Sequence, residues 1–218
     1  MHNQNWEPIS GPVAQDIRFL NYATQKNVLA ALVKFLLAKP KSQRDRSFPM
    51  PDENALHELH RAGTLFLLAE PGCYREIDVH VAKAGAITHQ PPPWQDVERL
   101  MQQFFRTLAS LWKTGDALDI AAYALWRIGW IHPFTDGNGR TASAFSYACL
   151  CVKLGALLPG RETVIDQMMA EPGRCERVLR AADRRFAKSN GKTDLRAVKK
   201  YLDDLLLRQI QTAEAETG

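Results

Sequence analysis

A histidine, an acid, two glycines and an arginine follow one another within nine residues, in the run HPFTDGNGR. His132 can take up a proton near neutral pH, and Arg140 can bind phosphate oxygens through two parallel N–H groups. Gly137 and Gly139 let backbone amides converge on an anion. A carboxylate beside an anion site needs a cation between them, so Asp136 indicates Mg²⁺ held on phosphates. This order of groups predicts transfer of a phosphorus-centred group.

The run lies between two apolar helical patterns, at 118–130 and at about 140–154. A helix that starts near Arg140 presents free N–H groups, which favour phosphate. Phe134 is expected to be a core residue that fixes the loop. Asn138 is expected to hydrogen-bond the backbone of the loop and so hold its shape.

Helical spacing of apolar residues dominates the rest of the chain. Further helices are predicted at 13–38, 54–69, 95–113, 162–170, 173–189 and 194–212. The stretch YREIDVHVAKAGAITHQPPP alternates instead, with Ile77, Val79 and Val81 on one face, and predicts a short β-hairpin. Such a hairpin is only marginally stable alone, so it must lie on the helices. We therefore expect a mainly α protein with one small hairpin.

Composition excludes several classes of protein. The chain has 218 residues, 45% of them hydrophobic, which suits one or at most two domains. The first ten residues show no signal-peptide pattern, and the longest apolar stretch, at 28–38, is too short to span a membrane. Four cysteines without a CxxC repeat predict reduced thiols in the cytoplasm and no zinc site.

Basic residues gather between 174 and 200 and raise the alternative of a nucleic-acid binder. They recur every three or four residues, as on a solvated helix face: Arg174, Arg177, Arg180, Arg184 and Lys188. We favour the solvated face, so nucleic acid is not the expected partner.

The run HPFTDGNGR resembles the central motif of the Fic family, HxFx(D/E)GNGRxxR. The stretch LHELHRAGTLFLLAEPGCYRE resembles the helix that leads to the hairpin of that family. VLRAADRRFAKSNGKTDLRAVKKYLDDLL resembles its closing helices. The resemblance covers roughly residues 54 to 208 and implies a Fic-like helical bundle with a β-hairpin flap over the active loop. We expect a helical extension at 1–53 packed on a catalytic domain at 54–212.

The resemblance implies protein adenylylation. His132 would deprotonate a hydroxyl of a target protein, whose oxygen would attack the α-phosphate of ATP and release pyrophosphate. Asp136 would hold Mg²⁺. The anion cradle would consist of Gly137, Asn138, Gly139 and Arg140.

The resemblance also implies partners. An extended segment of the target protein would pair with the hairpin near Thr88 and His89 by β-augmentation. A separate antitoxin-like protein could restrain the enzyme. The expected location is the cytoplasm, or a host cytosol after delivery, without membrane association.

Two departures from the family pattern stand out. Its last arginine, which holds the terminal phosphates in relatives, falls at Ser143. The inhibitory motif (S/T)xxxE(G/N) is also missing, since only Thr212 and Glu216 have the spacing and Thr217 follows them.

Alternative functions remain open. The same loop could transfer UMP or phosphocholine. Transfer of the γ-phosphate is disfavoured, because that version has lysine where this chain has Gly139. A non-catalytic interaction module that keeps the fold would be expected to have lost His132 or Asp136, and both are present.

Overall fold

The computed structural model describes residues 11–39, 48–83 and 85–217. Within these residues it contains eight α-helices and one antiparallel pair of strands, so the predicted mainly α fold with a small hairpin is confirmed. The elements are α1 Gly11–Leu37, α2 Glu53–Thr64, β1 Val81–Lys83, β2 Ala86–His89, the 3-10 helix η1 Trp94–Asp96, α3 Val97–Thr114, α4 Ala117–Ile131, α5 Asn138–Leu154, α6 Val164–Ala170, α7 Pro172–Lys188 and α8 Arg196–Thr217.

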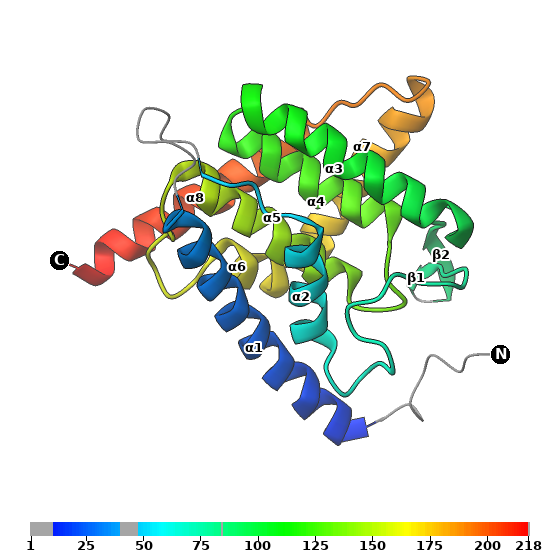
Figure 1. The fold of residues 1–218 in the computed structure, drawn as a ribbon, viewed down its shortest axis with the longest axis horizontal. Helices are drawn as coiled ribbons and strands as arrows, with labels where there is room; N and C mark the ends of the chain where they lie inside the picture. The colour runs from blue at the N-terminus through cyan, green and yellow to red at the C-terminus, as the bar shows by residue number, and fades with distance from the viewer. Residues whose placement is uncertain (1–10, 40–47, 84, 218) are drawn as a thin grey trace.

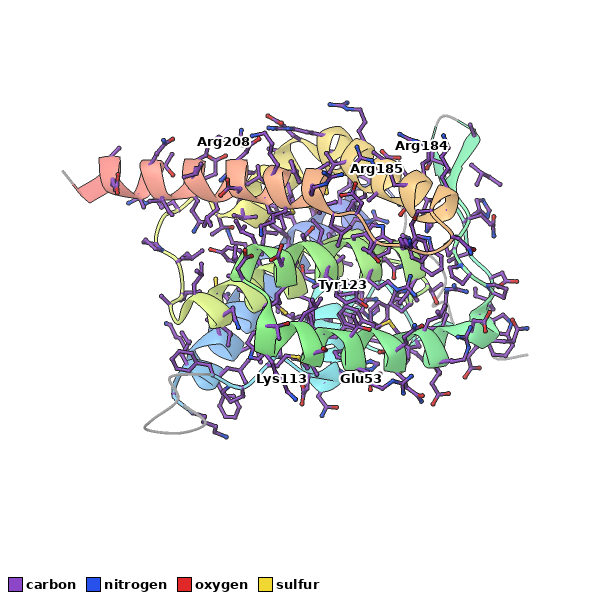
Figure 2. The ribbon with its side chains drawn as sticks, turned by 90° about the horizontal axis from the view of Figure 1, so that it is seen from above. Glu53, Lys113, Tyr123, Arg184, Arg185 and Arg208 are labelled. Carbon is purple, nitrogen blue, oxygen red and sulfur yellow. The ribbon has the colours of Figure 1, made fainter. Side chains whose placement is uncertain are left out.

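The helices α4 and α5 form the centre of the bundle. They are apolar on nearly every face, as expected for helices surrounded by protein. The α1 and α2 helices pack on α5, whereas α3 and α8 pack on α4. Figure 1 shows this arrangement, with the hairpin at one end of the bundle and the C-terminus at the other. Tyr123 of α4 points into the interior beside α3 (Figure 2).

The predicted helix at 13–38 is present as α1, and its side chains join it to α2. Asn21 Nδ2 donates to the Leu65 carbonyl at 2.7 Å, and Gln25 Nε2 donates to the Leu59 carbonyl at 2.8 Å. The division into an extension at 1–53 and a domain at 54–212 stays a prediction. Most of the polar loop expected at 39–54 lies outside the described residues.

Three predicted boundaries are wrong. The last helix, expected to end at residue 212, continues to Thr217. The helix expected to run to residue 69 ends at Thr64, because the chain turns at Leu65 and Phe66 has a positive φ of 62°. Of the apolar residues that suggested a longer helix, Leu65 and Phe66 are exposed in this turn, whereas Leu68 is buried. The first strand begins at Val81, although the alternation of apolar and polar residues starts at Ile77. The residues before Val81 do not pair with the second strand.

Side chains cap the starts of α2, α4 and α6, whereas α3, α5 and α7 begin without a side-chain cap. Asp52 accepts from the Ala55 amide at the start of α2, and Asp116 accepts from the Asp119 amide at the start of α4. Thr163 forms a capping box at α6. The start of α5 has no side-chain cap. No helix in the described ranges is long and apolar enough to cross a membrane.

Candidate active site

His132 ends α4 in a left-handed conformation, with φ 53° and ψ 59°. Side chains other than glycine rarely adopt this conformation, and functional residues often do. The imidazole Nδ1 lies 3.1 Å from the Gly129 carbonyl, which can only accept, so Nδ1 carries the proton. The other ring nitrogen, Nε2, is left as an acceptor on a residue that lines a cavity.

Burial lowers the pKa of His132 to about 4, and the positive charges of Arg180 and Arg75 act in the same direction. The ring is therefore neutral at pH 7. A neutral imidazole with a free Nε2 can accept a proton from a hydroxyl.

Phe134 fixes the loop that follows. Its ring, expected in the core, is fully buried and stacks on His60, with ring centroids 3.7 Å apart. The Asn138 side chain accepts from the Phe134 amide at 2.9 Å and donates to the Phe134 carbonyl at 2.7 Å. Asn138 is thus turned inward and contributes only its backbone to the cavity.

His60 supports the same loop from α2. Its Nε2 donates to the Asp136 carbonyl at 2.9 Å, and its Nδ1 accepts from the Gly72 amide at 2.8 Å. Burial lowers the pKa of His60 to about 4, so both hydrogen bonds persist with a neutral ring. The sequence analysis did not single out His60, although it lies in the stretch that resembles the Fic helix.

Arg75 is the second residue that the sequence analysis missed. Its side chain is buried, with the whole residue 2% exposed, and it donates from Nε to the His132 carbonyl at 2.7 Å. Its other nitrogens donate to the Ile77 carbonyl at 2.9 Å and the Pro92 carbonyl at 2.7 Å. The loop between α4 and α5, residues 132–137, is called the catalytic loop below because of its predicted role. Arg75 thereby joins this loop to both ends of the hairpin segment.

The start of α5 has the features of an anion-binding site. Gly137 has a φ of 76°, and a Cβ there would lie 2.6 Å from the Thr64 side chain, so only glycine fits. The next three residues begin the helix without a side-chain cap and line the cavity: Asn138, Gly139 and Arg140. Uncapped amides and a guanidinium at a helix start attract phosphate.

Asp136 lies at the exposed lip of this site. One carboxylate oxygen accepts from the Gly137 amide at 2.6 Å, and the other makes no hydrogen bond to the described residues. The described residues contain no cluster of three histidine, cysteine or acidic side chains that could hold a metal. A single carboxylate beside a phosphate site nevertheless suits Mg²⁺, which takes most of its ligands from phosphates and water.

These residues surround a cavity of about 390 Å³ with two different halves. The polar half is the loop and the start of α5. The apolar half is formed by Leu125, Met168, Met169, Pro172, Cys175 and Leu179. Among the described lining residues none is Phe, Tyr or Trp. One half of the cavity is therefore polar, with the Arg140 and Arg180 guanidinium groups, and the other half is apolar.

The two flap residues lie elsewhere. They line a separate groove of about 760 Å³ between β2 and α7. Thr88 Oγ1 donates to the Val81 carbonyl at 3.2 Å, across the hairpin. The His89 side chain points inward, and its Nε2 donates to the Trp130 carbonyl at 2.9 Å. A docked segment would therefore meet the His89 backbone and not its ring.

The solvated face predicted for α7 is wrong for Arg180. Arg177, Arg184 and Lys188 are exposed, whereas the Arg180 side chain is only 16% exposed. It lines both the catalytic cavity and the groove beside β2. Helical spacing places Arg180 among the basic residues, but it does not show that the hairpin and the catalytic loop cover this part of α7.

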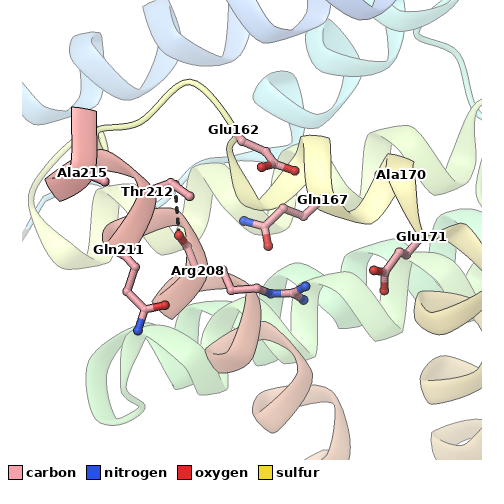
Figure 3. A pocket seen from close by; sticks show the side chains of 8 residues that line it. All are labelled: Glu162, Gln167, Ala170, Glu171, Arg208, Gln211, Thr212 and Ala215. Carbon is pink, nitrogen blue, oxygen red and sulfur yellow. Dashed lines mark hydrogen bonds between the residues drawn. The ribbon is translucent and has the colours of Figure 1, made fainter.

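A third cavity, of about 300 Å³, lies between the α6 and α8 segments and is unrelated to the loop (Figure 3). Its labelled residues include Gln167 and Arg208, and none belongs to the catalytic loop. The chemistry suggested by the sequence therefore gathers in the cavity at His132.

Comparison with known proteins relates part of the chain to a known family. The family model described as Fic/DOC matches residues 51–150, which include the catalytic loop. This part of the chain is a Fic/DOC family domain. The protein adenylyltransferase Fic of Nematostella vectensis is 39% identical over 84 residues, and the match covers 37% of this chain. The protein of the same name from Drosophila persimilis is 40% identical over 74 residues, covering 34% of this chain.

These matches span only 18% and 14% of the two relatives. The Fic fold itself extends over nearly the whole chain. A Fic family protein from Desulfovibrio desulfuricans G20 has a TM-score of 0.62 at 20% identity, covering 95% of this chain and 70% of that structure. Fic-1 (residues 134–508) from C. elegans has a TM-score of 0.62 at 18% identity, covering 97% and 55%. The expected Fic-like bundle is confirmed.

Proposed function

We propose that this Fic protein is an adenylyltransferase that transfers AMP from ATP to a serine, threonine or tyrosine hydroxyl of a target protein. One observation carries the proposal. The free Nε2 of a neutral His132 belongs to the same cavity as the uncapped start of α5 and Arg140. A proton acceptor beside a phosphate cradle suits attack of a hydroxyl on phosphorus.

The reaction follows from these positions. His132 Nε2 accepts the hydroxyl proton while the hydroxyl oxygen bonds to the α-phosphorus. The bond from that phosphorus to its bridging oxygen breaks, and pyrophosphate leaves. Arg140 and the first amides of α5 bind the phosphate oxygens, so catalysis is mainly positioning and charge stabilisation.

Asp136 would hold Mg²⁺ on the phosphates. Its exposed carboxylate at the lip of the cavity suits this role. The bound ion would neutralise charge on the phosphates. The Gly137 amide orients the carboxylate by its hydrogen bond.

The residues that line the cavity favour a nucleotide donor. The apolar half formed by α4, α6 and α7 suits a nucleobase. Recognition of choline relies on aromatic side chains, and none of the described lining residues is Phe, Tyr or Trp. UMP transfer remains the alternative that a donor assay must separate from AMP transfer.

The target protein would dock along β2, with its backbone hydrogen-bonding to the strand edge. The groove beside β2 is lined by three arginines, Arg177, Arg180 and Arg184, and by two acids, Glu176 and Asp183, and this small excess of positive charge favours a target segment with acidic side chains. Restraint by a separate antitoxin-like protein and action in the cytoplasm stay predictions.

The test incubates the full chain with Mg²⁺, lysate and ATP labelled at either the α- or the γ-phosphate. Transfer of the α-label alone, identified by mass spectrometry as AMP on a hydroxyl residue, supports the proposal. UTP, GTP and CDP-choline serve as competing donors. Transfer of the γ-label, or a clear preference for UTP or CDP-choline, would overturn adenylylation.

A further inference from the structure

Arg180 comes from α7, far in sequence from the catalytic loop, and yet lines its cavity. It shares that cavity with Arg140 and Ser143, the position where the family motif has its last arginine. The positive charge of Arg180 also lies close enough to lower the pKa of both His132 and His89. Arg180 therefore places a guanidinium group in the cavity, although residue 143 is a serine and provides none.

One nitrogen of the Arg180 side chain binds Asp183 of the same helix. Its Nη1 donates to Asp183 Oδ2 at 2.5 Å, and Asp183 Oδ1 accepts from Trp126 Nε1 at 2.9 Å. The Arg180 Nε is buried and makes no hydrogen bond within the described part of the chain. A buried donor on a cation without an acceptor is costly, so this arrangement indicates a missing anionic partner.

We propose that Arg180 is the second phosphate-binding guanidinium of this site, supplied by α7 in place of the arginine absent at Ser143. The inference rests on the proposed function, because it places a nucleoside triphosphate in the cavity. Arg140 would bind phosphate oxygens from the start of α5, and Arg180 would bind them from α7. The ligand class is a nucleoside polyphosphate, in preference to a monophosphate.

Calorimetric titration of ATP, ADP and AMP with Mg²⁺ tests the inference. Arg180→Gln removes the charge and the guanidinium group and leaves a shorter polar side chain. It should weaken ATP binding by about 10- to 150-fold, the range for loss of one charge-assisted hydrogen bond, and weaken AMP binding much less.

The matched control is Arg185→Gln on the same helix. Arg185 is 50% exposed and pairs with Asp194 at 3.8 Å, and Figure 2 shows it on the side of the molecule where α7 and α8 run. It lines neither the catalytic cavity nor the groove beside β2. This variant should bind ATP within about twofold of the parent, since surface charge pairs contribute little.

A rescue variant separates a lost contact from a disturbed fold. Ser143→Arg in the Arg180→Gln background should restore most of the ATP affinity, because it returns a guanidinium to the same cavity. If Arg180→Gln does not fold, Arg180→Lys can be used instead. Lysine keeps the positive charge but cannot make two parallel hydrogen bonds to a phosphate, so this variant should lose part of the affinity for ATP. Equal ATP binding by the parent and Arg180→Lys would then count against the inference.

The outcomes also distinguish this inference from the proposed function. A parent protein that binds no nucleotide defeats both. A parent that binds ATP and transfers AMP, with unchanged ATP binding in Arg180→Gln, defeats only the role of Arg180. An Arg180→Gln variant that changes only the KM for the target protein would assign Arg180 to docking and overturn the inference.

Discussion

The imidazole rings of His89 and His132 meet edge to face, with their centroids 5.8 Å apart. One ring ends β2 and the other ends α4, so the flap and the catalytic loop touch through two histidines. Burial lowers the pKa of each to about 4, and His60 behind the loop is lowered to about the same value.

These three histidines predict how stability depends on pH. Because their folded pKa values lie below the ordinary 6.5, the unfolded chain binds these protons first. Their contribution to stability is fully present above about pH 6.5 and is lost as the pH falls towards 4. Denaturant unfolding between pH 7 and pH 4.5 should show this decline. His60→Gln should reduce the slope by about one proton, and an unchanged slope would contradict burial of a neutral His60.

Replacing the base should stop transfer without unfolding the protein. Asparagine tolerates the left-handed backbone at residue 132, so His132→Asn keeps the loop and removes the proton acceptor. Transfer should fall by about 10²–10⁴-fold with ATP binding retained. A variant with near-parental labelling of the target and a parental melting temperature would show that another group is the base.

The Mg²⁺ ligand can be tested at Asp136. Asp136→Asn can still accept from the Gly137 amide, but it lacks the charge that attracts the ion. We expect ATP binding by the variant to be weak and nearly insensitive to Mg²⁺, measured by calorimetry with and without the ion. The same Mg²⁺ response in the two proteins would remove Asp136 as the ligand.

Arg75 should determine the stability of the whole site. Arg75→Met removes the donor from the carbonyls of His132, Ile77 and Pro92, and a hydrogen bond to a charged group is worth about 1.5–3 kcal/mol. The free energy of unfolding should fall by roughly 3 kcal/mol or more. Arg99→Met is the control, because Arg99 is 64% exposed and forms only a surface ion pair. Equal losses in the two variants would mean that the Arg75 contacts do not support the fold.

The two glycines of the cradle should respond differently to alanine. At Gly137 the backbone has positive φ and a Cβ meets Thr64 at 2.6 Å, so Gly137→Ala should destabilise the protein by about 1–3 kcal/mol. At Gly139 a Cβ meets nothing within 4 Å, so Gly139→Ala should fold like the parent. Its methyl group would still occupy ligand space and weaken ATP binding. Thermal melts and ATP titrations on both variants check this contrast.

The sequence predicted the parts of the site that are local. Helical spacing of apolar residues on either side of HPFTDGNGR indicated two buried helices, and the proline and glycines indicated a loop between them. The structure has α4 and α5 at these places. The inward turn of Asn138 also followed from local chemistry, since its partner is only four residues away.

The remaining parts depend on contacts between distant segments. Arg75 reaches residues 57 positions away, and Arg180 faces the cavity only because α7 packs beside α4 and the hairpin. Helical periodicity shows which residues share a face, but it does not show what covers that face. The early end of α2 has the same origin, because Asn21 of α1 binds the Leu65 carbonyl where the chain turns away.

The contacts of Arg75 divide the hairpin segment into a fixed base and a separate tip. Since one guanidinium binds carbonyls before β1 and after β2 as well as the loop carbonyl of His132, the base cannot swing outward unless the catalytic loop opens with it. The tip and the base of the hairpin segment should therefore open at different rates. We expect amides of the strands Val81–Lys83 and Ala86–His89 to exchange with solvent faster than amides at the base, which should exchange only at the slow rate of the bundle core.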